Sequence, residues 1–176
     1  MSVSNSEQET KTMGKKLAAR LRGGEIVCLY GELGAGKTTL VKGMAEGLGI
    51  KEEITSPTFT LMNVYRLPAT AYQLQALVHI DTYRLKNEQE LRAIGAEDYI
   101  GKLETVTVIE WPEKMENLLK GKKTIKITLE HGENGERKIT SSNNYSLLIP
   151  VADTPVQPVP HNPDYTYNPS HTQSPS

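Results

Sequence analysis

The hydrophobic and polar positions of residues 1–150 change repeatedly between helical and strand spacing. Met13, Leu17, Ala18 and Leu21 mark one face of a helix that should stop near Gly23-Gly24. The apolar run EIVCLY at 25–30 is typical of a buried strand, and residues 38–48, after a glycine-rich turn, predict a second helix. Further strands are expected around 59–67, 77–83, 106–111 and 124–131, and further helices near 88–94 and 112–119.

Single strands separated by helices favour an α/β fold with a mainly parallel central sheet flanked by helices. Asn134-Gly135 is a strong turn signal for a β-hairpin, so an antiparallel extension of the sheet is expected after residue 131. Seven of the ten prolines lie at or after Pro150, and residues 151–176 contain no Lys or Arg. We therefore expect one domain over 1–150 and a disordered, proline-rich tail over 151–176.

Charge and composition narrow the possible functions. Twenty basic and twenty-one acidic residues give a net charge of −1, which supplies no general field for a nucleic-acid backbone or an anionic membrane. One cysteine, Cys28, excludes an internal disulfide, and no apolar run is long enough to span a membrane. The first ten residues lack the pattern of a secretory signal. A soluble, cytoplasmic protein without membrane contact is expected.

The segment GELGAGKT at 31–38 fits the phosphate-binding pattern G-x-x-x-x-G-K-[ST], and it follows an apolar strand. Its glycines permit backbone torsions that turn successive N–H groups toward phosphate oxygens. Lys37 should reach the β- and γ-phosphates, and the Thr38 hydroxyl can ligate Mg²⁺. Thr39 is a further candidate phosphate contact. The pattern predicts a P-loop NTPase fold with a nucleotide site.

Two carboxylates follow apolar runs where the carboxyl ends of strands are expected. Asp81 in HIDTYRL and Glu110 in VIEWPEK should converge with the phosphate loop, because ligands of an open α/β sheet lie beyond these strand ends. Each could instead cap the next turn or helix. Thr58, in the hydroxyl-rich TSPTFT at 55–60, could sense nucleotide or belong to a helix-exit turn. Trp111, the one tryptophan, could be an ordinary core or boundary residue, but its place between Glu110 and Pro112 favours a position near the site or on a partner surface.

Taken in order, GELGAGKTTLVKGMAEGLGI, SPTFTLMNVY, HIDTYRL, ELRAIGAEDYI and VIEWPEK resemble the bacterial TsaE family of small P-loop ATPases over about residues 6–130. The resemblance implies a part in making N6-threonylcarbamoyladenosine at position 37 of tRNA. It implies the partners TsaD, which transfers the threonylcarbamoyl group, and TsaB. ATP binding and hydrolysis would reset the TsaB–TsaD complex, and tRNA would be met indirectly through that complex.

The resemblance also implies roles for individual residues. ATP and Mg²⁺ are the expected cofactors. Lys37 would bind phosphate, and Thr38, Asp81 and Glu110 would be the metal residues. Glu110 would be needed for hydrolysis and would form the catalytic set with Asp81 and Lys37. Thr58 would lie in a switch-like loop, and Trp111 beside the essential glutamate would face a partner. The rest of the phosphate cradle would be Gly34, Ala35, Gly36 and Thr39.

Two segments depart from the family pattern, and other functions stay open. The segment 66–78 is longer than is usual for the family and could form a longer hairpin loop. The tail beyond residue 150 has no counterpart in the family pattern. A small P-loop kinase acting on a metabolite is one alternative, although no Arg-rich lid stands out. A GTPase is another, but no N-K-x-D segment is present to bind guanine. A third is a nucleotide-binding regulatory subunit with negligible catalysis of its own.

Overall fold

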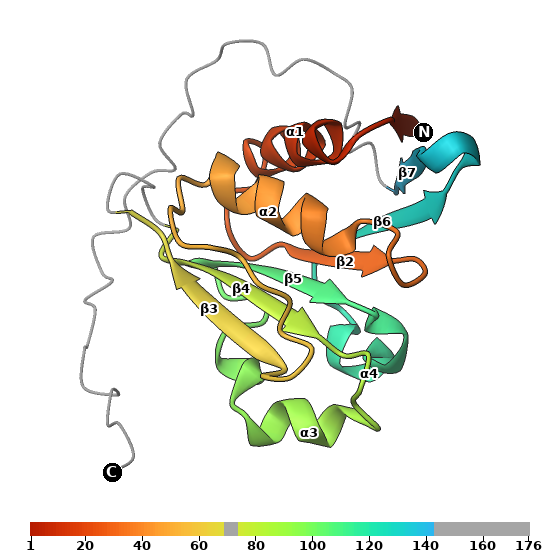
Figure 1. Cartoon of the computed structure of the whole chain (residues 1–176). Coiled ribbons are helices and arrows are strands. Elements are labelled where there is room, and N and C mark those ends of the chain that lie inside the picture. Colours follow the sequence, from red (N-terminus) through yellow and green to blue (C-terminus); the bar gives the residue numbers. More distant parts are fainter. Residues whose placement is uncertain (69–73, 143–176) are drawn as a thin grey trace.

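A computed structural model describes residues 1–68 and 74–142, which form one seven-stranded sheet with helices on both faces (Figure 1). The strand order is β1-β7-β6-β2-β5-β4-β3. The strands are β1 (Ser2–Ser4), β2 (Ile26–Tyr30), β3 (Met62–Arg66), β4 (Ala76–Asp81), β5 (Thr105–Glu110), β6 (Thr124–His131) and β7 (Arg137–Ser141). The tail predicted over 151–176 lies outside the described residues.

The centre of the sheet is parallel and both of its edges are antiparallel. β2 pairs in parallel with β5 and β6, and β4 pairs in parallel with β5. β7 pairs antiparallel with β6 across the short 3-10 turn η3 (Glu133–Gly135), which confirms the predicted extension. β3 pairs antiparallel with β4, as the interpretation of residues 66–78 as a hairpin loop implies, whereas the antiparallel pairing of β1 with β7 was not expected. The segment 66–78 contains the connection between β3 and β4, and its residues 69–73 lie outside the described part.

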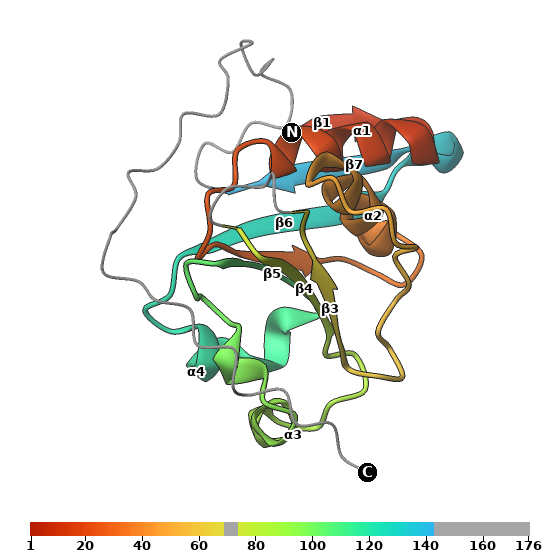
Figure 2. The ribbon, with the colours of Figure 1, turned by 90° about the vertical axis from the view of Figure 1, so that its left-hand side faces the viewer.

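Two pairs of helices cover the two faces of the sheet (Figures 1 and 2). One face carries α1 (Glu7–Ala18) and α2 (Lys37–Gly47), and the other carries α3 (Glu88–Ala93) and α4 (Glu116–Leu119). Strand β2 shows why its sequence is continuously apolar. Val27 and Leu29 belong to the core beneath α1 and α2, whereas Ile26 and Cys28 belong to the core on the opposite face. A central strand buried on both sides needs apolar residues at every position.

The helix predicted over 112–119 is wrong as a continuous element. The chain forms a 3-10 turn, η2 (Pro112–Lys114), and then the single turn of α4. Between them Met115 has φ −111° and ψ 18°, and its side chain is fully buried. Burial of this side chain outweighs the small energy of continuing so short a helix, which has little stability of its own.

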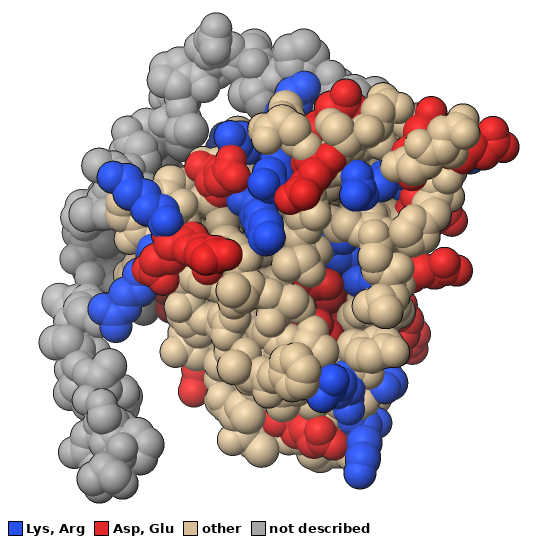
Figure 3. All heavy atoms as spheres, viewed as in Figure 1, with Lys and Arg blue, Asp and Glu red and all other residues tan. Residues whose placement is uncertain are grey.

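Acidic and basic side chains alternate over α1 and α2 on the face that Figure 3 shows. This distribution agrees with the near-neutral net charge of the chain. Within the two described ranges, none of the helices combines the length and the apolar character that crossing a membrane requires.

Candidate functional site

The glycine-rich loop between β2 and α2 has a shape that only glycine allows at two positions. Gly31 has φ 132°, and a Cβ there would lie 2.0 Å from the carbonyl oxygen of Leu129. Gly36 has φ 99° and precedes α2, where a Cβ would lie 2.8 Å from Nε of Arg137. At Gly31 the backbone of β6 excludes a side chain, whereas at Gly36 the obstacle is the flexible Arg137 side chain and the positive φ is what favours glycine. The loop thereby carries the chain from β2 into the N-terminus of α2. The positive end of this helix favours an anion beside the loop.

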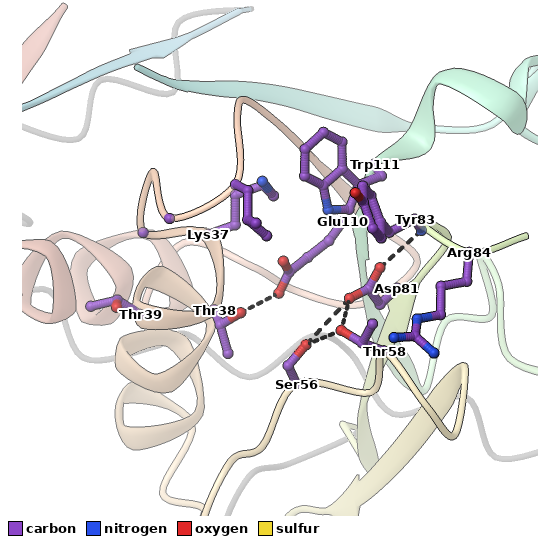
Figure 4. A pocket seen from close by; sticks show the side chains of 13 residues that line it. Lys37, Thr38, Thr39, Ser56, Thr58, Asp81, Tyr83, Arg84, Glu110 and Trp111 are labelled. Carbon is purple, nitrogen blue, oxygen red and sulfur yellow. Dashed lines mark hydrogen bonds between the residues drawn. The ribbon is translucent and has the colours of Figure 1, made fainter. Parts of the chain in front are cut away.

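A pocket of about 420 Å³ opens beside this loop, at the carboxyl ends of β2, β4 and β5. Figure 4 shows how side chains from the loop, from residues 56–58 and from the two strand ends point into it. The lining residues are Leu33, Gly34, Gly36, Lys37, Thr38, Thr39, Ser56, Thr58, Asp81, Tyr83, Arg84, Glu110 and Trp111.

Lys37 lies folded across the mouth of its own loop. Its Nζ donates to the carbonyl oxygens of Gly31 at 2.7 Å and Glu32 at 2.8 Å, and it stands 3.7 Å from the centre of the Trp111 ring. Burial lowers the pKa of Lys37, and the nearby carboxylates, chiefly that of Glu110, oppose this shift. The ammonium group is thus held by neutral carbonyls and an aromatic face, partners that a phosphate would outcompete.

Glu110, the last residue of β5, is 3% exposed and accepts two hydrogen bonds on one oxygen. The hydroxyl of Thr38 donates to Oε1 at 2.9 Å, and Nε2 of His79 lies 2.9 Å from the same atom. The first of these bonds connects the phosphate loop helix directly to the carboxylate, which confirms that the two predicted elements converge.

Asp81, the last residue of β4, connects to a different segment. Its Oδ2 accepts a hydrogen bond from Thr58 at 2.6 Å and one from Ser56 at 3.2 Å, and its Oδ1 accepts from the backbone N–H of Tyr83 at 2.9 Å. The two hydroxyls also contact each other at 2.7 Å. The hydroxyl-rich loop is therefore attached to the strand end through Asp81.

Trp111 adopts a left-handed backbone conformation, with φ 62° and ψ 49°, that is uncommon for a large side chain. Its backbone N–H donates to the carbonyl oxygen of Leu29, and the Thr82 hydroxyl donates to its carbonyl oxygen. The ring packs against Tyr83 with centroids 5.0 Å apart. These contacts hold the ring over the pocket, where Lys37 meets it.

The structure brings almost all of the sequence-predicted site residues to one pocket: Gly34, Gly36, Lys37, Thr38, Thr39, Thr58, Asp81, Glu110 and Trp111. Ala35 differs, because its side chain is buried in the core beneath α1 and α2 and its N–H donates to the carbonyl oxygen of Glu32.

Sequence reasoning gave little weight to Ser56 and missed Tyr83 and the contact of His79 with Glu110. The alternation of side chains along β4 was the available signal. His79 shares a face with Asp81, two residues further along the strand.

The side-chain oxygens of the pocket are too few to hold a small divalent cation by themselves, but they suit a cation that is also bound by phosphate. Among the described residues, no group of three or more His, Cys, Asp or Glu side chains could hold a metal ion by itself. The pocket offers two carboxylates, of Asp81 and Glu110, and the hydroxyl of Thr38. Mg²⁺ usually binds in this way, through one or two carboxylates with substrate phosphates and water completing its shell. The residues present therefore fit a nucleotide–Mg²⁺ complex.

A sheet with a parallel centre, a glycine-rich loop leading into α2 and carboxylates at two neighbouring strand ends define a P-loop NTPase fold. A family model described as "Threonylcarbamoyl adenosine biosynthesis protein TsaE" matches residues 4–139. The chain belongs to the TsaE family.

Individual relatives agree with this assignment. The tRNA threonylcarbamoyladenosine biosynthesis protein TsaE of Treponema pallidum is 44% identical over 138 residues, which cover 78% of this chain and 96% of that protein. The protein of the same description from Bacillus subtilis is 37% identical over 147 residues, 80% of this chain and 85% of that one. The crystal structure of YdiB from Bacillus subtilis has a TM-score of 0.62 and 32% identity, covering 80% of this chain and 82% of that one.

Proposed function

We propose that this protein is an ATP-binding and ATP-hydrolysing accessory protein for N6-threonylcarbamoyladenosine modification of tRNA. It acts with TsaD and TsaB and resets their complex between turnovers. Membership of the TsaE family supports the pathway. The observation that carries the ATPase activity is the hydrogen bond from Thr38, in the phosphate loop helix, to Glu110 at the end of the neighbouring strand β5.

Nucleotide binding follows from the loop and its lysine. The N–H groups at the start of α2 and the positive end of that helix receive the phosphates. Lys37 exchanges its two carbonyl partners for phosphate oxygens, which are stronger acceptors because they are charged. Thr38 and Asp81 would hold Mg²⁺, which would supply positive charge to neutralise the phosphates.

Hydrolysis needs a group that orients the attacking water and accepts its proton. Glu110 supplies this group, because one of its oxygens is held by Thr38 and His79 while the side chain lines the pocket. The carboxylate is buried, which keeps its orientation defined before nucleotide arrives.

The rim of the pocket is the proposed partner surface. Tyr83 is 50% exposed and packs against Trp111, and Phe59 is 81% exposed with the guanidinium of Arg84 4.3 Å from its ring. Exposed aromatic rings beside an arginine are typical of protein interfaces. A partner seated on this rim would cover the nucleotide, and hydrolysis would then depend on TsaB and TsaD.

Mg²⁺-dependent ATP hydrolysis by the purified protein, alone and with a bacterial TsaB–TsaD pair, tests the proposal. We expect turnover to rise sharply with the pair. Lys37→Ala is the inactive reference, and Lys42→Ala, on the same helix but outside the pocket lining, is its matched control. Glu110→Ala should bind ATP but lose turnover.

The partner surface has its own pair of variants. Trp111→Ala should weaken complex formation, whereas Leu103→Ala should not, since Leu103 is 78% exposed and precedes β5 at the opposite end of the sheet. An absent partner effect, together with phosphate transfer to a metabolite, would favour the kinase alternative. Normal hydrolysis by Glu110→Ala in the presence of the pair would remove its proposed role.

A further inference from the structure

A buried histidine contacts the candidate catalytic carboxylate from the side away from the phosphate loop. His79 is 0% exposed and its Nε2 lies 2.9 Å from Oε1 of Glu110. The pairing of β4 with β5 sets His79 opposite Val108, and both His79 and Glu110 face the side of the sheet covered by α2. A polar ring at this depth is costly unless it is hydrogen-bonded, and among the described residues the ring of His79 has one hydrogen-bond partner, Glu110.

The chemistry of the contact sets its direction. An ionised carboxylate has no proton to donate, so the imidazole donates from Nε2. The other ring nitrogen, Nδ1, is buried and has no hydrogen-bond partner among the described residues. A bare lone pair at Nδ1 is less costly to leave unpaired than an N–H group, which favours the neutral ring with its proton on Nε2.

The two donors to Oε1 differ in what nucleotide binding does to them. Thr38 is one of the residues expected to hold Mg²⁺, so its hydroxyl must adjust when nucleotide enters. His79 is buried in the sheet and lies outside the pocket lining, so its contact is independent of the ligand. Oε2 of Glu110 accepts no bond from the described residues and is the oxygen free to meet water.

We propose that His79 is a positioning residue for ATP hydrolysis: its Nε2–H holds Oε1 of Glu110 and thereby directs Oε2 toward the attacking water. This inference rests on the proposed role of Glu110. A misplacement of about 1 Å in a catalytic group lowers rates by about 100-fold, so removal of the ring should act on turnover far more than on nucleotide affinity.

Three variants separate positioning from packing. His79→Leu removes the donor with a side chain of similar size, and His79→Gln restores an N–H donor near the position of Nε2. Thr107→Val is the matched control, because Thr107 is a buried polar residue on adjacent β5 whose hydroxyl has no partner among the described residues. Turnover is measured with the TsaB–TsaD pair, and affinity is measured separately with a fluorescent ATP analogue.

We expect kcat of His79→Leu to fall by about 10- to 100-fold while the Kd for nucleotide changes less than about twofold. His79→Gln should recover most of the rate, and Thr107→Val should match the unmodified protein. In the Glu110→Ala background, His79→Leu should have no further effect on turnover.

Unchanged kcat in a folded His79→Leu variant, beside an inactive Glu110→Ala, would overturn the inference and leave the proposed function intact. Faster turnover would also overturn it, because the ring would then restrain Glu110. Normal ATP hydrolysis by Glu110→Ala would overturn both the inference about His79 and the proposed role of Glu110.

A spectroscopic measurement tests the contact without any turnover. In ¹⁵N-histidine NMR spectra of the full chain, the signals of His79 are those lost in His79→Gln. We expect the neutral ring with its proton on Nε2. A proton on Nδ1 with a bare Nε2 would overturn the inference, since such a ring cannot donate to Glu110, even where His79→Leu fails to fold.

Discussion

Asp81 and Glu110 are register partners: each is the last residue of its strand, and the parallel pairing of β4 with β5 sets them opposite one another. Their hydrogen-bond partners nevertheless come from different segments. Glu110 is joined to α2 through Thr38, whereas Asp81 is joined to the loop at 55–61 through Thr58. Two neighbouring carboxylates therefore connect the strand ends to two separate parts of the pocket wall, and variants can test each connection alone.

The connection through Thr58 predicts an effect on magnesium dependence. Thr58→Val removes the 2.6 Å hydrogen bond to Asp81 and leaves its Oδ2 to the weaker contact with Ser56. We expect the Mg²⁺ concentration for half-maximal ATP hydrolysis to rise by about 3- to 10-fold, the range for net loss of one typical hydrogen bond, because Ser56 still donates to Oδ2. Thr58→Ser should restore the ordinary value. Thr60→Val is the control, because the Thr60 hydroxyl donates to Asn63 outside the pocket. An equal rise in the Mg²⁺ requirement of Thr60→Val would show that loss of the hydrogen bond to Asp81 is not the cause.

The contact between Lys37 and Trp111 makes nucleotide binding visible by fluorescence. Trp111 is the one tryptophan of the chain, and the ammonium group lies 3.7 Å from its ring centre. ATP should draw Lys37 toward the phosphates, so tryptophan emission should change as ATP saturates the protein. Lys37→Met should lower affinity on the order of 100-fold, equivalent to about 2.7 kcal/mol. Lys42→Met should keep both the signal and the affinity. Constant emission while calorimetry records binding would show that the lysine stays on the ring.

The packing of α1 on α2 should make alanine less stable than glycine at position 43, although alanine is the better helix former. Alanine in a helix interior is favoured over glycine by about 1 kcal/mol. A Cβ at Gly43 would, however, lie 2.1 Å from the carbonyl oxygen of Lys11, and one at Gly14 would lie 2.3 Å from that of Leu40. Separating two backbones should outweigh the propensity, so Gly43→Ala should lower the free energy of unfolding by about 1–3 kcal/mol in denaturant melts. Thr12→Ala, at an exposed position of α1, should stay within about 0.5 kcal/mol. An unchanged melt for Gly43→Ala would mean that the helices can separate at little cost.

The buried thiol of Cys28 predicts a loss of stability at alkaline pH. Burial raises the pKa of Cys28 from 9.0 to about 11. The folded chain keeps the thiol protonated between these values while the unfolded chain ionises, so this stability is complete below pH 9 and is lost as pH rises toward 11. The loss from this group is about 2–3 kcal/mol. Unfolding free energies of the unmodified chain and Cys28→Ala, compared at pH 8 and pH 11, isolate it from other groups. Parallel pH profiles of the two proteins would contradict the assignment.

Local sequence determines the part of this protein that runs from β2 through the glycine-rich loop into α2. Three features of this segment depend only on residues close in sequence: a fully apolar strand, glycines where the backbone needs left-handed torsions, and a lysine and a threonine at the start of the helix. The predicted residues Lys37, Thr38, Asp81 and Glu110 accordingly lie in one pocket. The hairpin at Asn134-Gly135 was predictable for the same reason, because turn chemistry is local.

Contacts between distant segments decided the rest. Strand β1 has three residues and exists through its pairing with β7, more than 130 residues away, so its own sequence carries almost no signal. The break at Met115 follows from burial that local helix spacing does not encode. The register between β4 and β5 decides the contact of His79 with Glu110. The way in which the loops cover the strand ends decides two further contacts: the attachment of Ser56 and Thr58 to Asp81, and the stacking of Lys37 on Trp111. Residue types and short spacings thus determine which chemistry is available, whereas the partners of each side chain depend on packing free energy summed over the whole sheet.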